Sequence, residues 1–265
     1  MILASASPLP LSLSVAAAAA YAWPALQADQ LSQRSSRRWV EAAWLLHGLV
    51  LLATLFGPNP HFGFATAMSV TAWLIAAVYA VEVRFYPQLP TRWTLCALGA
   101  VAVLAGQLFP GIPMAHTRSP WLALHLAFAV ACYGLFGIAV VHAWFMTRAE
   151  ARFRHAQDPD TGIPLLTLER LTYRFATAGF VLLSATLLAG WLFGETLYGH
   201  AWRWDHKSVF SVLAWICLAA LMVGRFGLGW RGKRAVIVLY VGAALLLLAY
   251  IGSRFVTEIV LGRTQ

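Results

Sequence analysis

Long runs of apolar residues, separated by short polar segments, constrain the fold of this 265-residue chain more than any other feature. A run of about 20 apolar residues is long enough to cross the hydrocarbon core of a bilayer as a helix. The runs are unbroken rather than alternating, so they favour membrane helices over the strands of a β-barrel. We predict about eight transmembrane helices, over residues 2–23, 40–56, 62–81, 93–109, 121–146, 175–193, 208–224 and 235–255.

The composition agrees with a membrane protein. Hydrophobic residues make up 60% of the chain and charged residues only 11%, and the mean hydropathy is +0.70. A soluble chain of this length needs far more charge to cover its surface. We therefore predict an all-α integral membrane protein, a helix bundle that forms one polytopic domain over residues 1–265. No lysine or arginine precedes the first apolar run, so we predict a retained helix rather than a signal peptide.

The basic residues predict how the chain is oriented. Most of the 19 lysines and arginines follow the first, third, fifth and seventh predicted helices. The opposite face holds Arg118, Arg203, Lys207, Arg254 and Arg263. The positive-inside rule predicts that the arginine-rich loops of this multi-pass chain are cytoplasmic and that both termini are extracytoplasmic. Because the charge is spread over loops, it predicts contact with membrane lipids and no nucleic-acid partner.

The longest predicted cytoplasmic segment covers residues 147–174. Its centre, Asp158-Pro159-Asp160-Thr161-Gly162, has the composition of a turn. We predict a turn-rich connection without a core of its own, in which residues 167–170 begin a short interfacial lead-in to the sixth helix.

Two function classes find no support in the sequence. A thiol oxidoreductase needs paired cysteines, but the three cysteines are far apart and lie inside predicted helices. A transporter of small molecules would be expected to carry paired carboxylates inside the membrane. The acidic residues nearest the predicted helices lie only near helix ends, at Glu41, Glu82 and Glu258.

An unusual polar segment, residues 194–207, separates two of the apolar runs. It contains Trp202, Trp204 and Asp205, flanked by His200 and His206. Two tryptophans offer a flat stacking surface for a heme or another planar ligand. The extracytoplasmic cations Arg118, Arg203 and Lys207 are suited to pair with its propionates. The alternative is an interfacial aromatic belt, in which the tryptophans only anchor the chain at the bilayer surface.

The histidines supply candidate ligands for iron. His125 lies about one turn inside the fifth predicted helix and shares a face with Trp121, Phe128 and Cys132. A neutral imidazole among aromatic side chains suits an axial ligand of a porphyrin, although the same stripe suits ordinary helix packing. His47 lies near the middle of the second predicted helix, where it is either a ligand or an interhelical hydrogen-bonding group.

The C-terminal half, residues 121–263, resembles the cytochrome c assembly family, whose heme-handling membrane proteins include CcsA and the HemX- and YpjD-like proteins. The resemblance rests on five segments, which are Trp121-Leu-Ala-Leu-His125, Trp202-Arg-Trp-Asp-His-Lys207, Ser211-Val-Leu-Ala-Trp215, Gly229-Trp-Arg-Gly-Lys-Arg234 and Tyr250-Ile-Gly-Ser-Arg254. The set, together with the predicted topology and the chain length, most resembles the YpjD-like inner-membrane branch.

The resemblance implies roles for some of these residues and not for others. In heme-exporting members of the family, a Trp-rich segment on the outer face lies between two external histidines, and two further histidines lie within the membrane. His125 matches the first external histidine, and Trp202, Trp204 and Asp205 match the end of a Trp-rich segment that is short here. The second external histidine is missing near Leu261, and a membrane histidine is missing near Val223. The incomplete set predicts a protein that is not an enzyme and lacks holocytochrome c synthase activity.

Two hypotheses of different class remain. In the first, the protein binds a b-type heme, stably or in transit, and assists the biogenesis of cytochrome c or a respiratory complex, with apocytochrome or other membrane assembly factors as partners. His125 is then one ligand and His206, His200 or His47 the other. In the second, the fold is a cofactor-free membrane scaffold or regulator of another membrane protein, and His47 and His125 only bond between helices.

Overall fold

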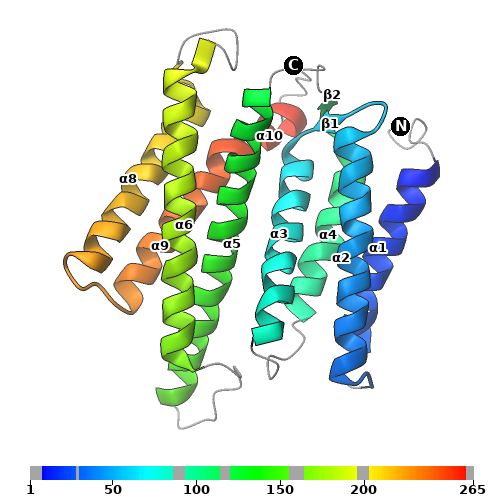
Figure 1. The fold of residues 1–265 in the computed structure, drawn as a ribbon, viewed down its shortest axis with the longest axis horizontal. Coiled ribbons are helices and arrows are strands. Elements are labelled where there is room, and N and C mark those ends of the chain that lie inside the picture. The colour runs from blue at the N-terminus through cyan, green and yellow to red at the C-terminus, as the bar shows by residue number, and fades with distance from the viewer. Residues whose placement is uncertain are drawn as a thin grey trace. The chain divides into compact units, whose positions relative to one another are not determined.

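The computed structural model describes residues 8–27, 30–85, 93–113, 120–154, 164–195 and 203–260, and almost all of them are helical (Figure 1). The elements in chain order are α1 (Pro8–Leu26), α2 (Gln33–Phe56), β1 (His61–Phe62), α3 (Phe64–Phe85), α4 (Trp93–Leu108), β2 (Ile112–Pro113), α5 (Pro120–Arg154), α6 (Leu165–Leu192), α8 (His206–Phe226), α9 (Lys233–Leu247), η2 (Leu248–Gly252), α10 (Ser253–Phe255) and η3 (Val256–Val260).

The helices have the length and apolar character of membrane spans. Within the described residues, 6 helices are long and apolar enough to cross a bilayer, and α1 and α4 contribute shorter apolar helices, Leu11–Leu26 and Thr94–Leu108. Each predicted apolar run therefore corresponds to a helix. The prediction of an all-α integral membrane protein is confirmed.

The chain divides into two compact units. The N-terminal unit comprises residues 1–116 and 254–265, and the C-terminal unit comprises residues 117–253. His47 lies in the first unit, and His125 and the Trp-rich segment lie in the second. Each unit has its own packing, and a single domain over residues 1–265 stays a prediction.

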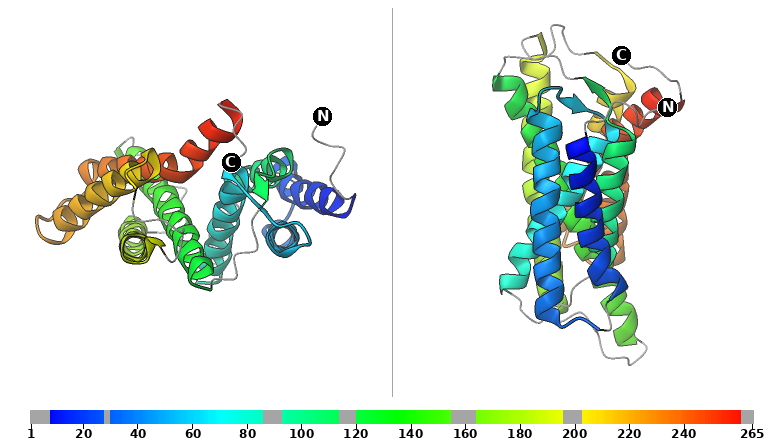
Figure 2. Two further views of the ribbon diagram at one scale, coloured as in Figure 1. Left: turned by 90° about the horizontal axis from the view of Figure 1, so that it is seen from above. Right: turned by 90° about the vertical axis from the view of Figure 1, so that its right-hand side faces the viewer.

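In the N-terminal unit, α1 packs against α2 and α4, and α3 packs against α4. Small residues allow the close approach, as is usual for membrane helices. A side chain at Gly99 of α4 would meet the Tyr21 ring at 2.8 Å, so this glycine makes room for a tyrosine of α1. The antiparallel pair β1–β2 joins His61 to Pro113 and Phe62 to Ile112, next to the first turn of α3 (Figure 2).

In the C-terminal unit, α5 and α6 form the most extensive pair, and α8 packs against both α6 and α9. Glycines again face large side chains. The Phe136 ring of α5 lies 3.0 Å from the position a side chain would take at Gly179 of α6. Leu218 of α8 lies 2.6 Å from the corresponding position at Gly242 of α9. These contacts fix the lateral packing of the helices.

The predicted connection over residues 147–174 is wrong in its limits. The helix α5 continues to Arg154, and α6 already begins at Leu165. Arginine, alanine and glutamate are good helix formers, so the helix persists beyond the point where hydrophobicity ends. The loss of apolar character marks where a span leaves the bilayer and does not mark where the helix stops.

Candidate functional site

His125 lies in the second turn of α5 and is half-buried. The helix face that His125 was predicted to share with Trp121 and Cys132 becomes more buried along α5. Trp121 is 66% exposed, whereas Cys132 is buried and its Sγ lies 3.4 Å from the Gly179 carbonyl oxygen of α6. The inner part of the stripe therefore packs helices together, as the packing alternative predicted. Its outer end is less buried, since Trp121 is exposed and His125 is half-buried.

The described part of the Trp-rich segment, residues 203–207, leads directly into α8. Trp204 is 71% exposed, and Arg203 and His206 are exposed as well. Trp202 and His200 lie outside the described residues, as do His116 and Arg118. The segment thus presents an exposed tryptophan and two exposed polar side chains immediately before and at the start of a membrane helix.

Asp205 has a structural role that the sequence analysis missed. It is the N-cap of α8, and its carboxylate accepts a hydrogen bond of 2.8 Å from the backbone N–H of Ser208. Partial burial opposes ionisation, but the Ser208 hydrogen bonds and the neighbouring Lys207 and His206 outweigh it and hold the pKa of Asp205 below its usual range. An anionic cap also interacts favourably with the N-terminal end of the helix dipole. An aspartate directly before an apolar helical run is the pattern that predicts such a cap.

Lys207 connects three helices at this end of the C-terminal unit. Its Nζ lies 5.7 Å from the centre of the Tyr250 ring in η2. Its ammonium also acts electrostatically on His125 of α5. The beginnings of α5 and α8 therefore lie at the same end of the unit as the end of α9 (Figure 1). This end of the unit therefore carries a half-buried imidazole, an ammonium and an exposed indole, side-chain types suited to a planar ligand with an anionic edge.

His47 has a different environment. It is fully buried in α2, its Nε2 lies 2.8 Å from Ser69 Oγ of α3, and its Nδ1 lies 3.4 Å from the Tyr21 hydroxyl of α1. The Tyr21 ring also meets the imidazole edge to face, with 5.8 Å between ring centroids. Both ring nitrogens are engaged, so His47 links three helices. It offers a nitrogen to iron only if one of these bonds breaks, and its ligand role stays a prediction.

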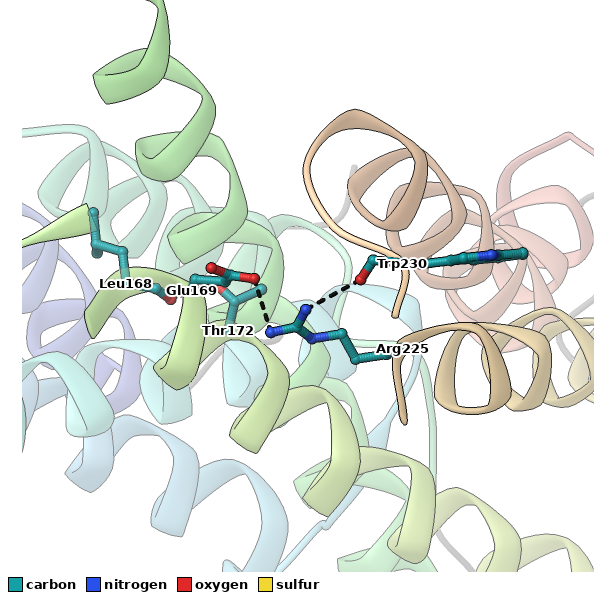
Figure 3. Close-up of polar contacts among 5 residues, drawn as sticks. All are labelled: Leu168, Glu169, Thr172, Arg225 and Trp230. Carbon is teal, nitrogen blue, oxygen red and sulfur yellow. Dashed lines mark hydrogen bonds and ion pairs between the residues drawn. The ribbon is translucent and has the colours of Figure 1, made fainter. Parts of the chain in front are cut away.

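A second polar cluster joins the first turns of α6 to the end of α8 (Figure 3). The Arg225 guanidinium is 2.8 Å from the Glu169 carboxylate, donates a hydrogen bond of 3.1 Å to the Trp230 carbonyl, and lies 4.4 Å from the centre of the Tyr173 ring. The two charged side chains are each 17% exposed, so the ion pair is partly shielded from solvent. The sequence analysis had treated Arg225 only as a marker of orientation.

The Trp230 indole in this cluster packs over Gly224, where it occupies the space that a larger side chain would need. Together these contacts fasten α6, α8 and the turn that leads into α9. The sequence analysis related glutamates near helix ends only to transport. A glutamate at the end of one helix and an arginine at the end of another also predict an ion pair that joins the two helices.

The comparisons with known proteins identify the family. The family described as "Cytochrome C assembly protein" matches residues 24–261, which takes in helices of both units. The "Cytochrome c biogenesis protein CcsA" of Synechococcus sp. strain CC9902 is 27% identical over 238 residues, 77% of this chain and 77% of the relative. The protein of the same name in Prochlorococcus marinus strain SARG is 36% identical over 88 residues, which is 33% of this chain and 28% of the relative. The one in Prochlorococcus marinus strain MIT 9303 is 28% identical over 187 residues, which is 60% of this chain and 59% of the relative.

No solved structure matches the chain. The YpjD-like branch stays a prediction. Because the family match extends over most of the chain, this protein belongs to the cytochrome c assembly protein family.

Proposed function

We propose that this protein binds heme at the end of the C-terminal unit where α5 and α8 begin, and that it delivers the heme during the assembly of cytochrome c or a respiratory complex. The observation that carries the proposal is that the exposed Trp204 and Lys207, whose ammonium lies over the Tyr250 ring, stand at the start of α8, at the same end of the unit as the start of α5, which carries the half-buried His125. Family membership supports it, because the similar proteins carry the name "Cytochrome c biogenesis protein CcsA".

The residues present fit a heme. A bound porphyrin needs a neutral nitrogen donor in apolar surroundings, a flat side chain for stacking and cations for its carboxylates. His125 supplies the donor from a partly apolar helix end, Trp204 supplies the flat surface, and Lys207 and Arg203 supply positive charge. Among the described residues, no group of three or more His, Cys, Asp and Glu side chains is placed to hold a bare metal ion. The donor set therefore suits iron within a macrocycle better than a free cation.

Each residue then has a specific task. His125 would hold the iron through its neutral imidazole, and His206 or His200 of the Trp-rich segment would supply a second nitrogen. Trp204 and Trp202 cover the ring face, and Asp205 keeps the start of α8 in place by capping it. When bound, the heme supplies one-electron redox chemistry. The chain itself would hold, orient and release the heme, which we take to be a b-type heme without a covalent link between the protein and the porphyrin.

The arrangement of charge supports an outer-face location. The Arg225 and Glu169 cluster lies at the arginine-rich end of the C-terminal unit, and the His125 end is opposite. With the positive-inside rule, the proposed heme site faces outward, both chain termini are extracytoplasmic, and the protein lies in a bacterial inner membrane. Apocytochrome and other membrane assembly factors are then its partners on that side.

The test is an absorption spectrum of detergent-purified protein, oxidised and dithionite-reduced, after expression with an ample heme supply. We expect a Soret band with sharp reduced α and β bands, which indicates low-spin iron with two axial ligands. His125→Ala should remove most of the low-spin signal, whereas His155→Ala, in the connection after α5, serves as the matched control and should leave it intact. An unchanged heme content in His125→Ala would show that another residue holds the iron.

The cofactor-free scaffold is the second candidate. Two sets of contacts favour it. The candidate ligand His47 bonds to Ser69 and Tyr21 of other helices, and Cys132, on the stripe that carries His125, packs against Gly179 of α6. In both cases the side chain joins helices. A featureless spectrum that persists after titration with hemin would support the scaffold. The Trp-rich segment would then be an interfacial anchor.

A further inference from the structure

The end of α9 contains a π turn, η2, at Leu248–Gly252. In a regular α-helix the Leu246 carbonyl would accept a hydrogen bond from the backbone N–H of Tyr250. Here the Tyr133 hydroxyl of α5 donates to that carbonyl at 2.6 Å, and the Tyr250 backbone N–H bonds to the same hydroxyl. The tyrosine oxygen is therefore inserted into the hydrogen-bond ladder of α9. A side chain inserted in this way is an established cause of local π geometry.

The π turn sets the direction of the side chains that follow it. One more residue is accommodated in the turn than in an α-helix, so the side chains beyond it are rotated about the helix axis. Tyr250 lies within this turn, and its ring is the one that Lys207 of α8 approaches at 5.7 Å. The packing of α8 against η2 brings the two elements together. The orientation of Tyr250 therefore depends on a hydroxyl located on a different helix.

Lys207 is the link between this turn and the proposed heme site. Its side chain is exposed and flexible by nature, and an unrestrained lysine samples many rotamers. The Tyr250 ring limits that freedom by a cation–π contact. The ammonium is thereby kept within electrostatic reach of His125.

We propose that the Tyr133 hydroxyl creates the π turn that holds Tyr250 against Lys207, and that it thereby keeps this ammonium at the end of the unit where α5 presents His125, as the counter-charge for the carboxylate edge of a bound porphyrin. Tyr133 and Tyr250 are positioning residues, and Lys207 is the residue that touches the ligand. The inference rests on the proposed function, since it names how that same site recognises the anionic part of its ligand.

The test compares two probes that differ only at the anionic edge, hemin and hemin dimethyl ester, in titrations of the purified full-length protein. We expect wild type to prefer hemin, and Lys207→Gln to reduce that preference by about three- to tenfold because a charge-assisted contact is lost. Tyr133→Phe and Tyr250→Leu should each reduce it by about two- to fivefold. Tyr133→Phe added to Lys207→Gln should reduce it no further. Tyr240→Phe, which removes a hydroxyl earlier on α9, is the control and should leave the preference unchanged.

Two results would overturn the proposal. The first is that the preference for hemin over its dimethyl ester is unchanged in both Tyr133→Phe and Tyr250→Leu. The second is that Tyr133→Phe reduces this preference as much in the Lys207→Gln variant as it does in wild type. A purely structural role of Tyr133 would weaken both probes equally and leave their ratio unchanged.

A second measurement keeps the positioning step separate from heme binding. In ligand-free protein, the rate at which an amine-reactive reagent acylates Lys207 can be followed by mass spectrometry. We expect Tyr133→Phe and Tyr250→Leu to raise that rate by about two- to threefold, because the ammonium is no longer held on the ring. If wild type binds neither probe, the proposed function fails, yet this rate still decides whether the π turn positions Lys207. An unchanged rate would overturn the positioning role whatever the titrations show.

Discussion

His47 and His125 are both histidines of membrane helices, yet the two units place them in opposite situations. His47 is fully buried, and each of its ring nitrogens lies against a hydroxyl of another helix. His125 is half-buried near a helix end, at the same end of its unit as the start of α8, which follows an exposed tryptophan. The first environment satisfies the imidazole from within the protein. The second is less buried and lies at the end of the unit where the polar segment 203–207 begins α8.

The difference shows that depth in the membrane does not by itself mark a functional histidine. An imidazole in the middle of a span is expensive only when its nitrogens lack partners, and Tyr21 and Ser69 remove that cost at His47. The informative property is the set of groups around the ring. By that criterion, we infer that His47 holds helices together and that His125 meets the ligand.

The largest expected effect that sharpens this comparison comes from His47→Ala. The substitution leaves a cavity and removes a partner from both Tyr21 and Ser69, two buried side chains. We expect the free energy of unfolding to fall by about 2–4 kcal/mol. Heme content per folded chain should stay at the wild-type level. Thermal unfolding in detergent and the reduced-minus-oxidised spectrum measure the two quantities on one sample.

His47→Asn is the matched variant, because its amide can still bond to one of the two hydroxyls and should recover part of the lost stability. The reverse pattern, in which stability is kept and the low-spin spectrum is lost, would break the comparison. His47 would then be an iron ligand, and the two units would share one function.

A smaller effect is expected at Gly99 of α4, which packs against Tyr21, the tyrosine whose hydroxyl lies against His47. Gly99→Ala places a methyl group 2.8 Å from the Tyr21 ring, so α1 and α4 must separate or the ring must shift away from His47. We expect a loss of about 1–3 kcal/mol in unfolding free energy. Gly106→Ala is the control, since the nearest atom there, Ser69 Oγ, is 3.8 Å away. Equal losses at both positions would show that the Tyr21 contact is not what makes Gly99 necessary.

Much of the fold could be predicted from the sequence, because hydrophobic length alone identifies membrane helices. Each predicted span corresponds to a helix, and the start of α4 at Trp93 was placed correctly. The limits of α5 and α6 were wrong, since hydropathy reports where a helix leaves the lipid and not where it ends. The π turn of η2 was not predicted either, because it depends on the Tyr133 hydroxyl of another helix and no local pattern encodes that contact.

The candidate site was predictable in part. The pattern of histidine and tryptophan near one membrane face indicated His125 and residues 202–206, and the structure places the start of α5 and the start of α8 at one end of the C-terminal unit. The approach of Lys207 to Tyr250 and the ion pair of Glu169 with Arg225 could not be derived, because they join residues that are distant in sequence. The cap formed by Asp205 was derivable, since an aspartate just before a helix is a local pattern.

The smallest expected effect is at Asp205, on the His125 side of the comparison. Asp205→Ala removes the hydrogen bond to the Ser208 N–H and should lower the unfolding free energy by about 1 kcal/mol. Asp205→Asn keeps an acceptor for that N–H and should recover most of the loss at neutral pH. Thermal unfolding of the three proteins, compared at one pH, measures this.

The pH dependence follows from the lowered pKa of Asp205 in the folded protein. The carboxylate binds its proton less readily when folded than when unfolded, so it stabilises the fold at pH values above the ordinary aspartate pKa of about 3.9. That contribution decreases as the pH falls through the lower pKa of the folded state. The stability difference between wild type and Asp205→Asn should therefore shrink in acid. A difference that stays constant from pH 7 to about pH 3 would mean that α8 is capped by geometry alone and that the charge at its N-terminus does not matter. The anionic cap would then give no support to the helix end that carries Lys207.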